Sequence, residues 1–251
     1  LVIAKEQAVT KARSRADFLA SMSHEIRTPL NGVLGMISLT LEDPLNDRQR
    51  EQLGIAQTTG KALLNLLNDI LDISKVESGK LELEHIALDL RDIVETTARL
   101  LAPNAHARQV SVFTSIEPSF PERVLGDPTR LRQIVSNLVG NAIKFTERGH
   151  VELRLAQLDE QRISIEIEDT GIGIPATQLE SIFRPFTQAD ADTTRRFGGT
   201  GLGLTLCHQL VGKMQGTITV HSTPGTGSLF RVDLPLDRKS TRLNSSHRLL
   251  S

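Results

Sequence analysis

A histidine lies in the middle of the stretch FLASMSHEIRTPLNG, residues 18–32. His24 is followed by Glu25, a carboxylate able to orient or deprotonate the imidazole, and by Thr28 one helical turn later, where a hydroxyl could position a water. A neutral imidazole, whose ordinary pKa is about 6.5, is a competent nucleophile at neutral pH. Pro29 removes a backbone donor and is expected to loosen the helix. A lone exposed histidine is usually only a surface residue, but these neighbours together predict a phospho-acceptor site.

A phospho-acceptor needs a donor, and the stretch LRQIVSNLVGNAIKFT, residues 131–146, offers one part of a nucleotide site. Asn137, Asn141 and Lys144 are spaced i, i+4 and i+7, so they share one helix face. Carboxamide oxygens suit Mg²⁺, and a lysine neutralises phosphate oxygens. A plain solvated face is the alternative, but it explains two asparagines poorly because asparagine is a mediocre helix former.

Three glycine-rich stretches offer the other parts of the site. In EDTGIGIP, residues 168–175, Asp169 could accept a hydrogen bond from an adenine amino group, and Gly171 and Gly173 would let the backbone approach a flat ligand. GGTGLGL, residues 198–204, opens a helix, where backbone amides meet phosphate, although such a loop is a weak signal by itself. STPGTGS, residues 222–228, taken alone predicts only a hairpin turn.

The elements that position these residues follow from the hydrophobic period, which is helical from residue 8 to about residue 76, with a loop at 42–47. His24 points roughly 150° away from the first apolar stripe, towards solvent. Each stripe covers one face, so we expect an αα-hairpin that pairs with a second copy in a four-helix bundle, with Gly79 capping the second helix. The stripes comprise Leu19, Met22, Ile26, Leu30, Val33 and Ile37, then Leu53, Ala56, Leu63, Leu67, Ile70 and Ile73.

Beyond Leu81 the pattern is mixed α/β, which predicts a sheet with helices on one face. Strands are expected at residues 111–116, 151–158, 163–168, 217–221 and 228–234, and helices at 90–101, 128–145 and 201–214.

Composition limits the class of protein. The 251 residues, 39% hydrophobic, suffice for one or two domains with real cores, and the single cysteine, Cys207, excludes a disulfide framework. A net charge of -1 without Trp or Tyr gives no reason to expect a nucleic-acid partner.

The start of the sequence is too charged for a signal peptide, and no apolar run reaches the roughly 20 residues of a membrane span. Since the sequence opens on Leu1, we expect part of a longer chain whose membrane anchor, if any, lies upstream. Residues 238–251 lack periodicity and are left out of the fold prediction.

These motifs, in this order, resemble those of a sensor histidine kinase of two-component signalling. The stretch around His24 is similar to the H box, LVGNAIKF to the N box, DTGIGIP to the G1 box, IFRPFTQ to the F box, GGTGLGL to the G2 box and TPGTGS to the last glycine box. The match runs from about residue 16 to residue 236. The form MSHEIRTPLNG and Gln188 are most similar to hybrid kinases, whose chains continue into a receiver domain.

The resemblance implies an α + α/β fold in which a helical hairpin, forming a dimeric four-helix bundle, precedes a GHKL-type α/β sandwich. The implied domains are a signalling helix or linker at residues 1–15, a dimerisation and phosphotransfer domain at 16–82, an ATP-binding domain at 83–236, and a tail at 237–251. It also implies a homodimer and the cytoplasmic portion of a membrane-anchored bacterial sensor.

The implied activity is transfer of the γ-phosphoryl group of Mg-ATP to His24, and then to an aspartate of a response-regulator receiver domain. Glu25 would assist proton removal and Thr28 the reverse, hydrolytic reaction, while Asn137 would hold Mg²⁺ and Asp169 would bind adenine. Residues 173–198 resemble a lid. The other implied nucleotide-binding residues are Asn141, Lys144, Gly171, Gly173, Phe186, Gly199, Thr200, Gly201, Leu202 and Gly203.

Two alternatives remain. A GHKL ATPase of the chaperone or mismatch-repair type would need no His24, and it would use a carboxylate in the helix that carries Asn141, where this sequence has no acid before Glu147. A non-enzymatic dimerisation scaffold would have no reason to keep Asn137, Asp169 and the glycine loops together.

Overall fold

A computed structural model describes the backbone of residues 2–187 and 200–235, with side chains from residue 21 onwards and at Leu19. The chain divides into two compact units at Leu81, and each is described by itself. Within the described ranges, no helix carries an apolar stretch long enough to cross a bilayer.

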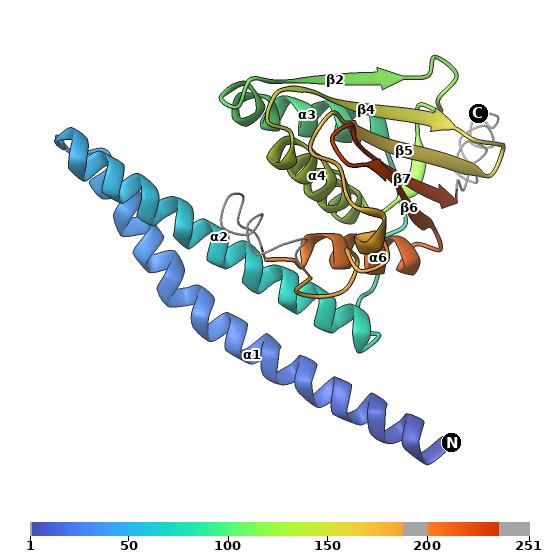
Figure 1. The fold of residues 1–251 in the computed structure, drawn as a ribbon. Helices are drawn as coiled ribbons and strands as arrows, with labels where there is room; N and C mark the ends of the chain where they lie inside the picture. Colours follow the sequence, from blue (N-terminus) through green and yellow to red (C-terminus); the bar gives the residue numbers. More distant parts are fainter. Residues whose placement is uncertain (1, 188–199, 236–251) are drawn as a thin grey trace, which may run out of the picture. The chain divides into compact units, whose positions relative to one another are not determined.

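The first unit is a hairpin of two long helices, α1 (Val2–Thr40) and α2 (Asp47–Glu77), which pack side by side (Figure 1). Asn46 begins α2 with a capping box, because its side chain accepts from the Gln49 N–H at 2.9 Å and the Gln49 side chain accepts from the Asn46 N–H at 3.1 Å. At the other end Gly79, with φ of +71°, lets Lys80 N–H donate to the Lys75 carbonyl at 2.9 Å.

The two apolar stripes are only partly buried inside this hairpin. Leu34 packs closely on α2, where a Cβ on Gly60 would lie 2.7 Å from Leu34 Cδ2. In contrast, Ile26, Val33 and Leu63 are 43%, 54% and 48% exposed. A single hairpin therefore leaves large apolar side chains of both stripes in solvent.

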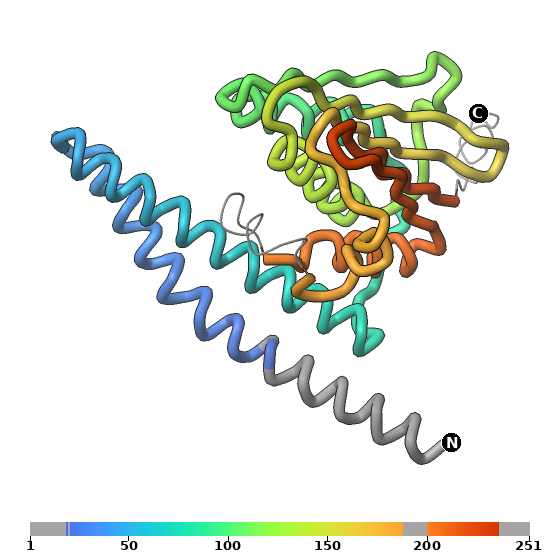
Figure 2. The backbone as a smooth tube through the Cα atoms, viewed as in Figure 1, coloured from blue at the N-terminus to red at the C-terminus, as the bar shows by residue number. Residues whose placement is uncertain are grey.

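The second unit is an α/β layer structure. Its main sheet has five strands in the order β2-β4-β5-β7-β6, in which β2 and β4 are parallel and the other pairs antiparallel. Figure 1 shows the three helices on one face of this sheet, and Figure 2 follows the backbone between them. The main-sheet strands are β2 (Val110–Ile116), β4 (Gly149–Gln157), β5 (Arg162–Asp169), β6 (Thr217–Thr223) and β7 (Gly227–Pro235), and the helices are α3 (Leu90–His106), α4 (Pro128–Phe145) and α6 (Gly203–Lys213). A separate two-stranded ladder pairs β1 (Ile86–Leu88) with β3 (Val124–Gly126), and a short 3₁₀ helix, η1, spans Ala176–Gln178.

The core lies between the helices and the sheet. Alternate residues of β4 and β5 point inwards, and the central members of both strands, such as Leu153 and Ile165, are fully buried, as are Leu138 of α4 and Leu206 of α6. On the opposite face Arg154 pairs with Glu152, Glu166 and Glu168, so that face is charged. This one-sided burial is the reason for the alternating pattern in the sequence.

The predicted fold class is confirmed in its helical hairpin and its α/β unit with helices on one face; the dimeric bundle stays a prediction. Three details differ from the sequence expectations. Helix α3 continues to His106 through Pro103, because its last turn is held by Ala105, which is completely buried. Strands β1 and β3 were not predicted, since three residues are too few for a period. Pro29 does not interrupt α1, which runs unbroken to Thr40.

Candidate nucleotide and phospho-acceptor sites

The predicted phospho-acceptor residues lie along one exposed side of α1. His24, Glu25 and Thr28 are all exposed. The Thr28 hydroxyl does not point freely into solvent, because it donates to the carbonyl of His24 at 3.1 Å. Its oxygen lone pairs can still accept a hydrogen bond, so the expected contact with a water would be as an acceptor.

Two residues close to His24 in the sequence fix the orientation of α1 against α2. Ser23 is completely buried, with its hydroxyl unpartnered among the described residues, and Arg27 donates from Nη2 to Asn68 Oδ1 of α2 at 2.9 Å. The imidazole is therefore displayed from a helix whose rotation relative to α2 is fixed within the hairpin.

Helix α4 carries the three predicted residues on a single face. Its N-terminus is capped by Asp127, whose Oδ1 accepts from the Arg130 N–H at 3.0 Å, with Pro128 at the first position. Ile134 and Leu138 are completely buried, whereas Asn137, Asn141 and Lys144 are only half-buried. The amphipathic pattern of α4 thus places the amides of the two asparagines and the ammonium of the lysine at the edge of the core, where they are partly exposed.

Asn137 faces the start of α6. A Cβ built on Gly203 would lie 3.6 to 3.7 Å from the Asn137 side-chain amide, which places that amide directly beside the first residue of α6. The Asn137 Nδ2 is buried and makes no hydrogen bond within the described part of the chain. An unpaired buried N–H donor costs free energy, and a phosphate oxygen of a ligand would accept its hydrogen bond.

Lys144 lies at the end of the same face. Its Nζ is 4.6 Å from the centroid of the Phe145 ring. Burial, and secondarily the charge of Arg108, lower the pKa of the Lys144 ammonium from its ordinary value. An incoming anion would relieve both effects, because it replaces lost hydration and screens the second cation.

Asp169 ends β5 and is 6% exposed. Its Oδ1 accepts from the Gly171 N–H at 2.8 Å, and the backbone of Ser228 also donates to its carboxylate. Burial raises the pKa of Asp169, hydrogen bonds from Gly171 and Ser228 partly oppose this, and the charge of Glu168 adds to it. The carboxylate is thereby fixed in direction and poorly hydrated, as expected for a group that binds a polar ligand edge.

The loop after Asp169 packs tightly on its neighbours. A Cβ on Gly171 would lie 2.5 Å from the Phe145 carbonyl oxygen, and Gly173, with φ of +69°, would drive a Cβ into the carbonyl of Thr223. The N–H of Ile172 donates to the Phe145 carbonyl at 3.2 Å. The two predicted glycines therefore let this loop contact both the end of α4 and the turn between β6 and β7.

The last glycine-rich loop is described from Thr200 onwards. Leu202 is buried and its N–H donates to Thr200 Oγ1 at 3.2 Å. Gly201, with φ of +69°, accepts on its carbonyl from the Phe186 N–H at 3.2 Å, and the Phe186 side chain is 70% exposed. Gly199 and the second part of the lid expected at residues 173–198, from Gln188 onwards, lie outside the described residues.

Most of the nucleotide-site residues predicted from the sequence thus meet at one end of the α/β unit. Close contacts join Asn137 to Gly203, Asp169 to Gly171, and Phe186 to Gly201. Asn141 lies one turn beyond Asn137 on α4. His24, Glu25 and Thr28 belong to the helical unit.

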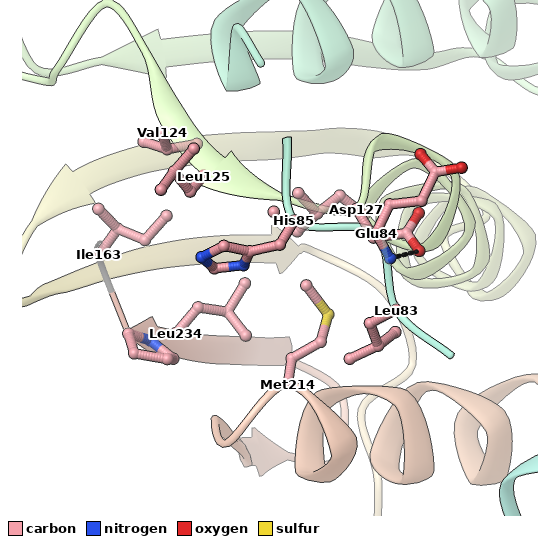
Figure 3. A pocket seen from close by; sticks show the side chains of 12 residues that line it. Leu83, Glu84, His85, Val124, Leu125, Asp127, Ile163, Met214 and Leu234 are labelled. Atoms are coloured by element: carbon pink, nitrogen blue, oxygen red, sulfur yellow. Dashed lines mark hydrogen bonds between the residues drawn. The ribbon is translucent and has the colours of Figure 1, made fainter. Parts of the chain in front are cut away.

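A second hollow, at the opposite end of the α/β unit, contains none of the predicted residues. It has a volume of about 110 Å³, and Figure 3 shows His85 directed across it near Ile163, Leu234 and Met214. Its rim is closed by the Glu84 N–H, which donates to Asp127 Oδ2 at 3.1 Å. Since Ile163 is the second residue of β5 whereas Asp169 is the last, this hollow is separate from the nucleotide site.

Sequence reasoning missed several residues that hold the site. Arg108 donates from Nη1 to the Lys144 carbonyl at 3.0 Å, and Ser222 Oγ accepts from the Ile174 N–H at 2.7 Å. Ser222 lies in a stretch that alone predicted only a turn, and Arg108 belongs to no motif. Their roles depend on pairings between distant segments, which a local pattern does not reveal.

Two family models match the chain. Residues 14–79 match the His Kinase A (phospho-acceptor) domain, and residues 126–238 match the histidine kinase-, DNA gyrase B-, and HSP90-like ATPase. The first match contains His24, and the second contains all the predicted nucleotide-site residues.

Similar proteins agree with these matches. The signal transduction histidine-protein kinase BarA of Escherichia coli (strain K12) is 45% identical over 241 residues, which cover 94% of this chain and 26% of BarA. The hybrid signal transduction histidine kinase A of Dictyostelium discoideum is 42% identical, covering 94% of this chain and 11% of that protein. The crystal structure of full-length ShkA in complex with AMPPNP superposes with a TM-score of 0.75 at 35% identity, covering 88% of this chain and 46% of ShkA.

A phospho-acceptor helical hairpin followed by an ATPase-type α/β unit defines a two-part kinase architecture. The chain belongs to the sensor histidine kinases, and its relatives support a kinase of the hybrid type, which confirms the resemblance seen in the sequence. It spans about a quarter of the length of BarA.

Proposed function

We propose that this chain is an ATP-dependent protein histidine kinase that phosphorylates His24 and passes the phosphoryl group to an aspartate of a response-regulator receiver domain. One observation carries the proposal: a single chain joins an exposed histidine in a phospho-acceptor domain to an ATPase-type unit in which the buried Asn137 Nδ2 has no hydrogen-bond partner among the described residues.

The donor set fits Mg-ATP. Asn137 would hold Mg²⁺, Asn141 and Lys144 would face the phosphates, and the carboxylate of Asp169 would accept from the adenine amino group. Thr200, Leu202 and the adjacent glycines would surround the phosphates at the N-terminus of α6, where backbone N–H groups favour anions. When bound, Mg²⁺ supplies charge neutralisation on the phosphate oxygens.

The His24 imidazole would act as the nucleophile. A lone pair on one ring nitrogen attacks the γ-phosphorus, the bond from that phosphorus to the bridging oxygen of ADP breaks, and ADP leaves with the electron pair. The other ring nitrogen then carries a proton that Glu25, the adjacent exposed carboxylate, accepts. The exposure of His24 supports this role, since the donor must approach from outside the hairpin.

The active form would be a homodimer. Ile26, Val33 and Leu63, members of the two predicted stripes, are 43 to 54% exposed in a single hairpin. Burying such side chains against a second copy contributes about 25 cal/mol for each Å² removed from water. A dimeric four-helix bundle would cover these stripes while leaving His24 on the outer side.

The remaining roles are part of the same proposal. The receiver domain could be a separate protein or belong to the same full-length chain, and the chain would be the cytoplasmic portion of a membrane-anchored sensor. Thr28, which already contacts the backbone of His24, would assist hydrolysis of a phosphorylated receiver by accepting a hydrogen bond from the attacking water.

Incubation with radiolabelled ATP and Mg²⁺ tests the reaction class. The chain should take up label that is stable in base and lost in acid, because a P–N bond to imidazole behaves in this way, and EDTA should prevent uptake. Label that is stable in acid and lost in base would indicate serine or threonine esters and would contradict the proposal. Release of inorganic phosphate without any labelling of the chain would instead favour the ATPase alternative.

A further inference from the structure

The last turn of α4 is held by its own C-cap residue and by contacts from two other segments. A helix end leaves its final carbonyls without intrahelical partners. Here the Ala142 carbonyl accepts from Thr146 Oγ1 at 2.7 Å, and the Phe145 carbonyl accepts from the Ile172 N–H at 3.2 Å. The Lys144 carbonyl accepts from Arg108 Nη1 at 3.0 Å. The guanidinium of Arg108 is thus one of the groups that fix this helix end.

Arg108 reaches α4 from the neighbouring helix. Its N–H donates to the Ala105 carbonyl at 2.9 Å at the end of α3, and Gln109, with φ of +59°, then turns the chain into β2. The backbone of Arg108 is therefore set by the end of α3, which packs against α4. A cation at a helix C-terminus also interacts favourably with the helix dipole.

This turn carries the phosphate end of the proposed nucleotide site. Lys144 lies on this last turn and Asn141 directly before it. The hydrogen bond from Ile172 to Phe145 joins the turn to the loop after Asp169. A displacement of the turn would move the ammonium of Lys144 and the nucleoside-binding loop together. The contact from Arg108 acts at the point where these two parts meet.

The charges of Arg108 and Lys144 also act on one another. Besides burial, the charge of Arg108 lowers the pKa of Lys144, so the two cations lie close enough to repel. Two positive charges held near each other by a folded backbone form a favourable environment for a polyanion, since binding of the anion removes their repulsion.

We infer that Arg108 is a positioning residue of the nucleotide site, which holds the last turn of α4 so that Asn141 and Lys144 face the polyphosphate of a nucleoside triphosphate. This inference rests on the proposed function. It assigns a role in nucleotide affinity to a residue outside every motif, through a side-chain contact to a backbone carbonyl.

The test compares three variants of the full chain by calorimetric titration with a non-hydrolysable ATP analogue and Mg²⁺. Arg108→Ala removes the contact, and Arg108→Lys keeps the charge and one donor. Arg91→Ala is the matched control, because Arg91 is also an arginine that donates to a backbone carbonyl, that of Phe120 at 2.6 Å, but it lies at the first turn of α3, away from the nucleotide site. Thermal unfolding of each variant is measured in parallel.

Arg108→Ala should raise the Kd for the analogue about five- to tenfold, as expected for loss of a charge-assisted contact that orders a site, and Arg108→Lys should recover part of this. In steady-state labelling, the KM for ATP should rise while kcat at saturating ATP changes little. Arg91→Ala should lower the melting temperature yet leave the Kd within about twofold.

The other outcomes distinguish a failure of the proposed function from a failure of the role assigned to Arg108. If the unmodified chain binds no analogue, the proposed function fails. If it binds and Arg108→Ala binds equally well, only the role of Arg108 is refuted. An equal loss of affinity in Arg91→Ala would show that the effect comes from general stability, and it would also overturn the inference.

Discussion

Replacing Asp169 with Asn tests the nucleoside-binding part of the site with almost no change in shape. The carboxylate is 6% exposed and accepts hydrogen bonds from the backbone of Gly171, at 2.8 Å, and of Ser228. Asparagine keeps one acceptor oxygen, but its amide NH₂ group can only donate. A ligand amino group that donates to Asp169 would therefore face another donor in the variant.

The expected loss of affinity follows from the charge of the acceptor. A hydrogen bond to a charged group contributes about 1.5–3 kcal/mol, and every 1.4 kcal/mol is tenfold in Kd. We therefore expect Asp169→Asn to weaken binding of a non-hydrolysable ATP analogue by about 10- to 100-fold. The stability of the fold should change little at neutral pH, because the variant loses one backbone partner but no longer buries a charge.

The pH dependence of stability gives an independent check. Burial raises the pKa of Asp169 in the folded state, so its contribution to stability is fully present below its ordinary pKa of about 4 and is lost as pH rises through the raised folded value. The asparagine variant has no such titration. The variant should therefore become more stable relative to the unmodified chain, as measured by the difference in their free energies of unfolding, when the pH rises from about 4.

Calorimetric titration at pH 7, combined with urea unfolding across the pH range, measures both effects. Asp159→Asn is the matched control, since Asp159 is an exposed aspartate that accepts from the Gln161 N–H at 2.7 Å in the turn between β4 and β5. The control should bind the analogue with unchanged affinity. An Asp169→Asn variant that is folded and binds as tightly as the unmodified chain would remove Asp169 from the site.

Two further substitutions test the dimer and the loop after Asp169. In sedimentation velocity, Leu63→Asp combined with Ile70→Asp should convert a dimer into monomers or aggregates, because charges would be buried in the bundle. Lys61→Asp on the same helix should leave the dimer intact. A well-folded monomer for the unmodified chain would refute the dimer. Gly173→Ala should lower the melting temperature more than Gly225→Ala. Both glycines have positive φ, of +69° and +78°, but only at Gly173 would a Cβ collide with a backbone carbonyl. Equal effects on the melting temperature would mean that this close contact carries no cost.

Periodic elements were predictable from the sequence. Helix α4 matches its expected range of 128–145 because a capping aspartate, a proline at its first position and an apolar stripe all agree. The strands of the main sheet were found because one face is buried and the other charged, which produces a strict alternation. Local pattern therefore predicted the main-sheet strands and their covering helices, whereas the GHKL-type sandwich was expected from the family resemblance.

Features that depend on distant pairing were not predictable. The ladder of β1 with β3 has three residue pairs and joins segments about forty residues apart, as its Ile86 to Gly126 pairing shows. The contact of Arg108 with the Lys144 carbonyl likewise requires the packing of α3 on α4. The candidate site residues themselves were found from motifs, whereas the contact of the Ser228 backbone with Asp169 depends on the pairing of β5 with β7.

The direct test of the central claim is the phosphorylation of His24. Phosphopeptide mapping after exposure to Mg-ATP should place the acid-labile phosphate on the peptide that contains His24. His24→Gln should abolish labelling while nucleotide binding persists, Glu25→Ala should slow labelling by about 10²- to 10⁴-fold without abolishing it, and His221→Gln, at an exposed position on β6, should have no effect. Normal uptake of acid-labile phosphate by the His24→Gln chain would contradict the account.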